Sequence, residues 1–217
     1  HDFTARHSGI GHYDDFLITN NQAAAIAESF SDMAGEAAEY FDTQSNDFLF
    51  MGELMDCAPD DCPADVGLRY FAEPSRDGAS IDSFSDVTDN AHLYDLTGVF
   101  NKAYYLFATS HGWDPVLAFQ PFVWANRYCW QRDTQFVAAA ECVLEGAKVL
   151  DLAWRDVVVA FAAVDIPVSP DTSFAYFGIQ VIDSTLQLTD LSQSSDTIES
   201  WHWQLGDGQV ANGSTVS

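Results

Sequence analysis

The fold of this chain is decided by one acidic, alanine-rich stretch, ESFSDMAGEAAEYF, at residues 28–41. Apolar side chains recur at helical spacing through it and just before it. They are Ile26, Phe30, Met33, Ala37 and Tyr40. This period predicts an amphipathic helix over residues 20–43.

The same helix carries four acids near one stripe: Glu28, Asp32, Glu36 and Glu39. Two interpretations are open. The stripe is either a solvated acidic face or a set of carboxylates that a cation holds together. The residues between the acids are mainly Phe, Met, Gly and Ala, which are unusual choices for a surface. The composition therefore favours the cation.

Four further helices are predicted outward from this one. A loop-rich region, residues 44–91, separates them from the first helix. The apolar periodicity predicts helices over residues 95–109, 114–130, 135–150 and 153–164. Asp114-Pro115 is a typical helix start, with a capping side chain followed by proline in the first turn. Pro121 lies inside the same helix, where proline costs about 3 kcal/mol or produces a kink.

The pattern changes after the segment 166–171. From Phe174 to Ser217 the apolar residues alternate, which predicts β-strands separated by turns. This stretch is too short for an immunoglobulin-like sandwich of about 100 residues. We therefore expect the natural polypeptide to continue past Ser217.

The charge of the chain is strongly negative, with 33 acidic and 8 basic residues. A net charge of −25 argues against nucleic acid or an anionic membrane as a partner, because phosphate contacts require lysine and arginine. Two explanations remain: a surface adapted to salt, and bound Ca²⁺. We assign the first to the overall charge and the second to a local cluster. No apolar run is long enough to cross a membrane.

Four cysteines are present, and their spacing predicts two local disulfides, Cys57–Cys62 and Cys129–Cys142, typical of an oxidising compartment. Free buried cysteines are the alternative. The absence of a CxxC pair argues against a zinc knuckle.

Several blocks of the sequence resemble the thermolysin-type zinc endopeptidases, closest to the vibriolysin and pseudolysin branch. The first block is the acidic helix itself with its downstream NDFL. The others are LRYFAEPSRDGASID at 68–82, TGVFNKAYYLFATSHGWD at 97–114 and FVWANRYCW at 122–130. Their common order implies a mainly α fold, the carboxyl-terminal helical domain of these enzymes, with about five helices.

The resemblance implies a zinc site. In this family two histidines of an HExxH helix and a downstream glutamate hold Zn²⁺, and a water fills the fourth position. HDFT at the amino terminus is similar to the end of that helix, so His1 would be its second histidine. Glu28 would be the third ligand, and Asp32 would orient a ligand histidine. The first histidine and the catalytic glutamate would lie just before His1, so we expect this chain to lack the first half of its polypeptide.

Further roles follow from the same resemblance. Arg69 would grip the substrate carbonyl, although it could simply pair with an acid, and Leu68 would form a wall of the specificity pocket. A calcium site would use the side chains of Glu36, Glu39 and Asp47 with the carbonyl of Leu49. The alternative is that these residues are merely acidic.

One departure from the family falls at a catalytic position. The oxyanion-stabilising histidine falls on Tyr94, and His92 lies two positions early. A phenol can donate the same hydrogen bond, and loss of one such donor typically costs about 10²–10³ in rate. The sequence therefore supports two functions. One is a secreted zinc-dependent endopeptidase acting on proteins or peptides. The other is a degenerate, calcium-stabilised relative that serves as a binding domain.

The carboxyl-terminal stretch DTIESWHWQLGDGQ, at 196–209, resembles the core of a polycystic-kidney-disease (PKD) domain. Trp201 and Trp203 would share one face of a strand, although both could be simple packing residues. The expected domains are a peptidase helical domain at 1–166, a linker at 167–173 and a truncated, all-β PKD-type sandwich at 174–217.

Overall fold

A computed structural model describes residues 21–50, 67–88, 90–168, 177–182, 185–190, 197–205 and 208–216. The chain divides into two compact units, His1–Val168 and Ser169–Ser217. Each unit is described by itself below. The expected Cys57–Cys62 disulfide and the expected ligand His1 lie outside the described residues.

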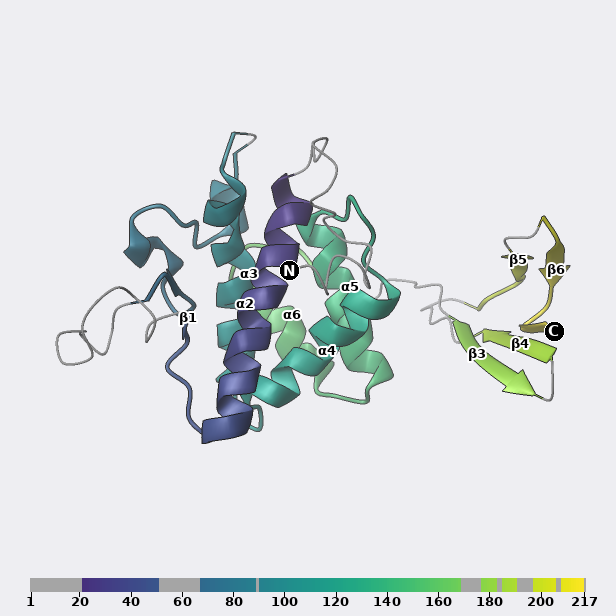
Figure 1. Ribbon diagram of the computed structural model, residues 1–217. Helices are drawn as coiled ribbons and strands as arrows, with labels where there is room; N and C mark the ends of the chain where they lie inside the picture. Colours follow the sequence, from purple (N-terminus) through teal and green to yellow (C-terminus); the bar gives the residue numbers. More distant parts are fainter. Residues whose placement is uncertain are drawn as a thin grey trace. The chain divides into compact units, whose positions relative to one another are not determined.

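The first unit is mainly helical, as predicted (Figure 1). Its described helices are α2 (Asn21–Thr43), α3 (Leu93–Ala108), α4 (Pro115–Tyr128), α5 (Phe136–Val149) and α6 (Trp154–Ala162). All five predicted helices are confirmed, with ends within two residues of those expected. α2 packs along α3 and also contacts α4, α4 packs on α5, and α6 contacts α3 and α5. The core between them is rich in aromatic rings, including Phe100, Tyr104 and Phe136.

Helix α2 is buried over much of its acidic stripe. Glu28, Asp32 and Glu36 are only 3%, 1% and 3% exposed, and Glu39 is half-buried. The solvated acidic face is therefore wrong for the first three acids. Buried carboxylates need ion pairs, hydrogen bonds or a metal to offset the cost of removing them from water.

Helix α4 begins as its sequence predicts. The side chain of Asp114 accepts a hydrogen bond from the Leu117 amide at 2.8 Å, and Pro115 occupies the first turn. The helix continues through Pro121 to Tyr128. Gly146 of α5 faces Pro121, and a Cβ at this glycine would lie 2.7 Å from the Pro121 carbonyl oxygen. Only glycine therefore permits the close approach of α5 at the proline.

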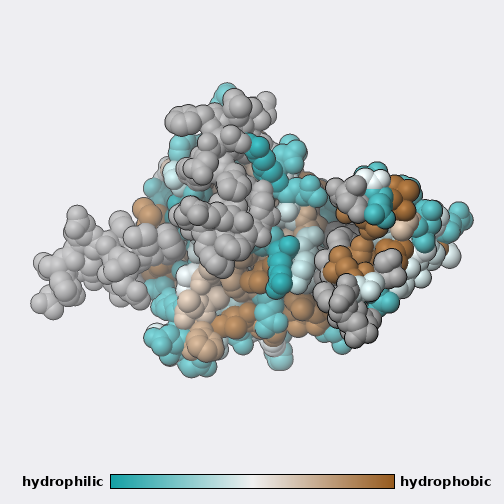
Figure 2. All heavy atoms as spheres, turned by 45° about the vertical axis from the view of Figure 1, so that its right-hand side comes forward, coloured by the Kyte–Doolittle hydropathy of each residue, from teal (hydrophilic) through white to brown (hydrophobic). Residues whose placement is uncertain are grey.

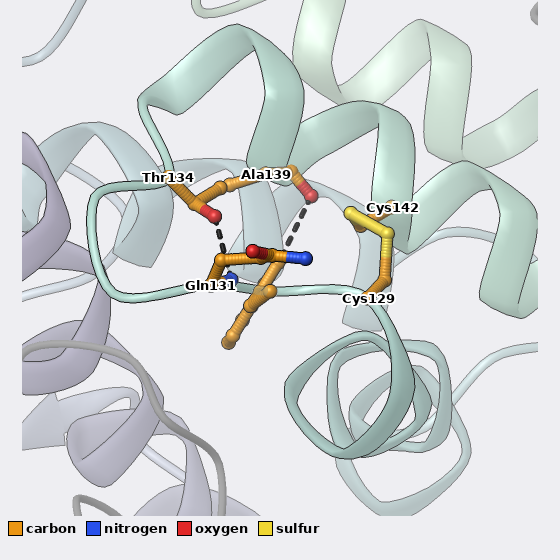
Figure 3. Close-up of a disulfide and its surroundings, with 6 residues drawn as sticks. Cys129, Gln131, Thr134, Ala139 and Cys142 are labelled. Carbon is orange, nitrogen blue, oxygen red and sulfur yellow. Dashed lines mark hydrogen bonds between the residues drawn. A yellow bond between two sulfur atoms is a disulfide. The ribbon is translucent and has the colours of Figure 1, made fainter. Parts of the chain in front are cut away.

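The end of α4 is tied covalently to α5. Cys129, which caps α4, forms a disulfide with Cys142, as predicted (Figure 3). The Trp130 indole nitrogen donates a hydrogen bond to the Ala139 carbonyl at 3.1 Å beside it. The Gln131 amide donates to the Thr134 hydroxyl at 2.7 Å. The turn between the two helices is thus fixed at both ends.

A pair of short strands after α2 carries Arg69, which contacts Asp32 of this helix. Strand β1 (Leu49–Phe50) pairs antiparallel with β2 (Arg69–Tyr70), with Phe50 opposite Arg69. Two 3₁₀ turns, η2 (Pro74–Asp77) and η3 (Phe84–Asp86), lead from β2 to α3. Gly98 of α3 lets this segment approach, because a Cβ there would lie 2.6 Å from that of Pro74.

The second unit contains small antiparallel sheets. Strands β3 (Phe177–Ile182), β4 (Thr185–Asp190) and β7 (Thr215–Val216) form one, in the order β3-β4-β7. Strands β5 (His202–Gln204) and β6 (Val210–Asn212) form the other. The Trp203 indole nitrogen donates to the Gly213 carbonyl at 2.7 Å. The predicted β-character is confirmed, but a PKD-type sandwich stays a prediction.

The surface mixes hydrophilic and apolar side chains (Figure 2). Large exposed apolar residues occur on both units, among them Phe41 at 75%, Val159 at 66% and Val210 at 62% exposed. Scattered exposure of this kind is normal for a folded protein. Within the described residues, no helix is both long and apolar enough to cross a membrane.

Candidate functional site

Two acids of α2 lie at the centre of the site. Glu28 and Asp32 are one helical turn apart and both are buried. Burial raises the pKa of Asp32 to about 6, and the charge of Glu28 adds to this shift. The positive charge of Arg69 and the hydrogen bonds of Arg69 and Asn101 act in the opposite direction. Arg69 and Asn101 therefore favour the ionised form of Asp32 against the effect of burial.

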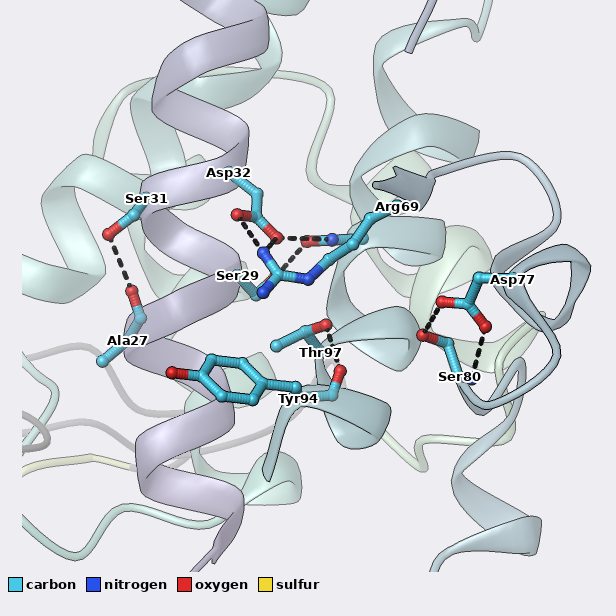
Figure 4. A network of polar contacts seen from close by, with 10 residues as sticks. Ala27, Ser29, Ser31, Asp32, Arg69, Asp77, Ser80, Tyr94 and Thr97 are labelled. Carbon is cyan, nitrogen blue, oxygen red and sulfur yellow. Dashed lines mark hydrogen bonds and ion pairs between the residues drawn. The ribbon is translucent and has the colours of Figure 1, made fainter. Parts of the chain in front are cut away.

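Arg69 pairs with Asp32, so the ion-pair alternative for this arginine is realised. Its Nη1 lies 2.6 Å from Oδ1 and 2.8 Å from Oδ2 of the carboxylate. Figure 4 shows the guanidinium of Arg69, on β2, facing the carboxylate of Asp32 on α2. The side chain of Arg69 is 13% exposed and that of Asp32 is 2% exposed. The ion pair is thus almost wholly buried, and Arg69 is the more exposed of its two members.

Tyr94 lies beside this pair, in the first turn of α3. The Arg69 guanidinium carbon is 5.4 Å from the centroid of its ring, a cation–π contact. Tyr94 is 40% exposed. His92 is the N-cap of α3, and its Nδ1 accepts from the Tyr94 amide at 3.4 Å. The structure therefore brings Tyr94, Arg69 and Asp32 together and uses His92 as a helix cap.

Leu68 precedes Arg69 and is 44% exposed. A large apolar side chain left open to solvent next to a buried ion pair can contact an apolar group of a ligand.

A second cluster begins with Glu36, one turn beyond Asp32 on α2. One carboxylate oxygen each from Glu36, Glu39 and Asp47 lies within 4.8 Å of the other two. Glu36 Oε2 is buried and has no hydrogen-bond partner among the described residues. Burial raises the pKa of Glu36 to about 8, and the charges of Glu39 and Asp47 also raise it. A hydrogen bond from Asn46 lowers the pKa and opposes these effects. The Leu49 amide donates to Asp47 Oδ1 at 2.9 Å, which places Leu49 next to the three acids.

Sequence reasoning missed two polar residues of the site, Asn101 and Ser29. Asn101 Nδ2 donates to Asp32 Oδ2 at 2.9 Å, and the Ser29 hydroxyl donates to Asn101 Oδ1 at 2.5 Å. Asn101 is 1% exposed and Ser29 is fully buried. The available signal was Asn101 within the largely apolar stretch VFNKAYYLF of α3.

The family of the chain follows from comparison with known proteins. The thermolysin metallopeptidase alpha-helical domain matches residues 16–166. This range holds the five described helices and both clusters. The chain therefore belongs to the thermolysin metallopeptidase family.

Relatives with curated names agree. The hemagglutinin/proteinase of Vibrio cholerae is 34% identical over 194 residues, which cover 89% of this chain and 29% of that protein. A neutral protease of Vibrio proteolyticus is 35% identical over 169 residues, or 78% of this chain and 26% of that protein. A zinc metalloprotease of Helicobacter pylori is 35% identical over 178 residues, or 82% of this chain and 66% of that protein. The chain thus spans less than two thirds of the length of each of these relatives.

A solved structure shares the fold. The precursor of protealysin, a metalloproteinase from Serratia proteamaculans, superposes with a TM-score of 0.59 at 20% sequence identity. The match covers 75% of this chain and 53% of that one.

The zinc that this family implies suits the residues present. Zinc takes carboxylate oxygen as a ligand, and a carboxylate as buried as that of Glu28 needs a cation or hydrogen bonds close by. Asp32, one turn away, is of the residue type that commonly orients a ligand histidine.

Proposed function

We propose that the full-length protein is a secreted zinc-dependent endopeptidase of the vibriolysin and pseudolysin branch, acting on proteins or peptides. The observation that carries this proposal is the pair of buried acids Glu28 and Asp32, with Arg69 bound to Asp32. Such an arrangement fits a site that binds a divalent metal and a polar substrate group, because each member is a poor choice for a plain core. The paired cysteines Cys129 and Cys142 support secretion.

In this proposal zinc is held by Glu28, by His1 and by a histidine that precedes this chain. Zinc, when bound, polarises the scissile carbonyl and lowers the pKa of its water. Asp32 accepts a hydrogen bond from a ligand histidine and so fixes the orientation of that ring.

The other residues of this chain bind the substrate. Arg69, held by Asp32, turns its open side toward the substrate carbonyl oxygen. The phenol of Tyr94 donates a hydrogen bond to the oxyanion that develops on the scissile carbonyl. Leu68 contributes an apolar wall to the pocket for one substrate side chain.

Hydrolysis of casein by the full-length protein tests this function. We expect activity that a chelator abolishes and zinc restores. Tyr94→Phe keeps the ring beside Arg69 and removes the hydroxyl, so kcat should fall about 10²–10³-fold while KM changes little. Tyr128→Phe, an exposed tyrosine of α4, serves as the matched control and should leave kcat unchanged.

Two results would count against parts of this proposal. If Tyr94→Phe retains full kcat, the phenol is not the oxyanion donor. If the wild-type protein binds zinc and cleaves nothing, the domain is a degenerate relative that acts by binding.

The second cluster is proposed as a structural calcium site formed by Glu36, Glu39, Asp47 and the Leu49 carbonyl. Ca²⁺ takes carboxylate and carbonyl oxygens. The buried Glu36 Oε2, which has no hydrogen-bond partner among the described residues, supports this assignment. A bound cation would also remove the repulsion among the three acids.

Calcium is expected to raise the melting temperature. At a concentration 100-fold above its Kd, a ligand that binds only the folded state stabilises it by about 2.7 kcal/mol, or roughly 5–10 °C here. Glu39→Gln should abolish most of the shift. Glu141→Gln, an acid of α5 outside the cluster, should preserve it. A melting temperature unmoved by millimolar Ca²⁺ would refute the calcium site.

The calcium effect should also depend on pH. Without a cation, Glu36 keeps its proton up to about pH 8 in the folded state, whereas the unfolded chain loses it near pH 4.5. The stability without calcium therefore falls as the pH rises from about 4.5 to 8. Because Ca²⁺ binds the ionised form, the shift should be larger at pH 8 than at pH 5.5. Equal shifts would show that Glu36 is not a ligand.

For the remainder of the chain we propose a linker at 167–173 and the beginning of a PKD-type module at 174–217. The antiparallel pairing of β5 and β6, with Trp203 opposite Ala211, supports this.

A further inference from the structure

A buried polar network runs across the α2–α3 interface of the first unit. Ser29 and Asp32 belong to α2, and Asn101 belongs to α3. The serine hydroxyl donates to Asn101 Oδ1 at 2.5 Å, and Asn101 Nδ2 donates to Asp32 Oδ2 at 2.9 Å. None of the three residues is more than 1% exposed. A buried chain of this kind fixes the geometry of its members because each missing bond would cost a desolvated group.

The donor and the acceptor of each hydrogen bond in this network are determined. An ionised carboxylate only accepts hydrogen bonds, so Asp32 requires the NH₂ end of the Asn101 amide. The amide oxygen is then turned toward Ser29, whose hydroxyl supplies the matching donor. Without Ser29, the buried carbonyl oxygen of the Asn101 amide would lose this hydrogen-bond donor.

This arrangement distinguishes the two oxygens of Asp32. Oδ2 accepts from both Asn101 and Arg69, which uses its two lone pairs. Among the described residues, Oδ1 accepts a hydrogen bond from Arg69 alone, which leaves one lone pair. The carboxylate can thus receive one more hydrogen bond, and it can do so at Oδ1.

We propose that Asn101, supported by Ser29, is a positioning residue that holds Asp32 so that Oδ1 receives the N–H of a zinc-ligand histidine. This inference rests on the proposed function, in which Asp32 orients such a histidine. Asn101 contacts neither metal nor substrate and acts through Asp32. Arg69 alone does not distinguish the oxygens, because its Nη1 binds both.

The test is the zinc dissociation constant of the full-length protein, measured by competition with a chelator. Asn101→Leu has nearly the same shape and no donor, and it should weaken zinc binding about tenfold, the lower end for loss of an outer partner of a metal site. Asn126→Leu is the matched control, since Asn126 is a buried asparagine of α4 and should not alter zinc binding. Equal weakening by both variants would overturn the proposal.

Double variants separate positioning from packing. In an Asp32→Ala background, Asn101→Leu should cost no further zinc affinity, because the residue through which it acts is gone. A further tenfold loss in that background would show that Asn101 supports the site only as packing. Ser29→Ala should weaken binding about threefold alone and not at all once Asn101 is leucine, as expected for one relay.

Two further comparisons complete the test. If Asn101→Leu does not fold, the milder Ser29→Ala variant still decides: unchanged zinc affinity there would overturn the proposal. Glu28→Gln reports on the proposed function separately. If Glu28→Gln and Asp32→Ala weaken zinc binding while Asn101→Leu does not, the positioning role alone fails. If Glu28→Gln has no effect, the zinc site itself is wrong.

Discussion

Glu28→Gln is expected to weaken zinc binding by the full-length protein more than about 100-fold, beyond the usual cost of losing an outer partner of a metal site. The substitution keeps the shape of the side chain and removes its charge, so the helix should still fold. Hydrolysis of casein should fall with the zinc content. The measurement is zinc affinity by chelator competition, with bound metal counted after dialysis.

A matched control and a second form of the protein sharpen this prediction. Glu145→Gln alters an equally buried glutamate, 1% exposed on α5, and should not change zinc affinity. In the present chain alone, without the histidine expected upstream, Glu28→Gln should have little effect, since two ligands hold zinc poorly. Equal weakening with and without the upstream half would mean that the site is not the proposed one.

Arg69→Met is expected to destabilise the folded protein by about 3–5 kcal/mol at pH 8, because it leaves Asp32 buried without its cation. The cost should shrink at pH 5. The pKa of Asp32, about 6 with Arg69 present, rises further without it, so both proteins carry a largely protonated Asp32 at pH 5. Urea unfolding at the two pH values measures the difference. The variant should also lose peptide hydrolysis, because Arg69 is the proposed carbonyl ligand.

The ion pair can be isolated by comparison with other variants. Arg76→Met removes an exposed arginine stacked on Tyr70, with a guanidinium carbon 4.5 Å from the ring centroid, and should cost less than about 1 kcal/mol. Adding Asp32→Asn to Arg69→Met should restore most of the stability, since no buried charge then remains. A cost for Arg69→Met that is the same at pH 5 and pH 8 would show that Asp32 does not titrate in this range.

The helices could be predicted from the sequence because their signals are local. The apolar period of residues 20–43 and the Asp114-Pro115 start depend only on neighbours along the chain, and the structure has both. The Cys129–Cys142 pairing could be predicted because a single turn joins the two helices that carry the cysteines. The carboxyl-terminal strands were also predictable, whereas their assembly into a sandwich was not, since it depends on contacts that a short alternating pattern does not encode.

The candidate site divides in the same way. The family blocks of the sequence named Glu28, Asp32, Arg69 and Tyr94 as a set. That the stripe of α2 is buried, and that Arg69 is bound to Asp32, came only from the structure. Spacing along one helix tells which acids share a face, but not whether another element covers that face.

By itself the sequence determined the five helices, the disulfide between α4 and α5, and the family to which the chain belongs. Only the tertiary structure showed that Asn101 contacts Asp32 and that Ser29 contacts Asn101. It also showed that His92 caps α3 and that the Tyr94 ring lies against Arg69. The physical reason is range. Helix periodicity, capping and turn chemistry act over a few residues. The partners of a buried charge come instead from segments about 40 to 70 residues away in sequence, which meet only when α2, α3 and β2 pack together.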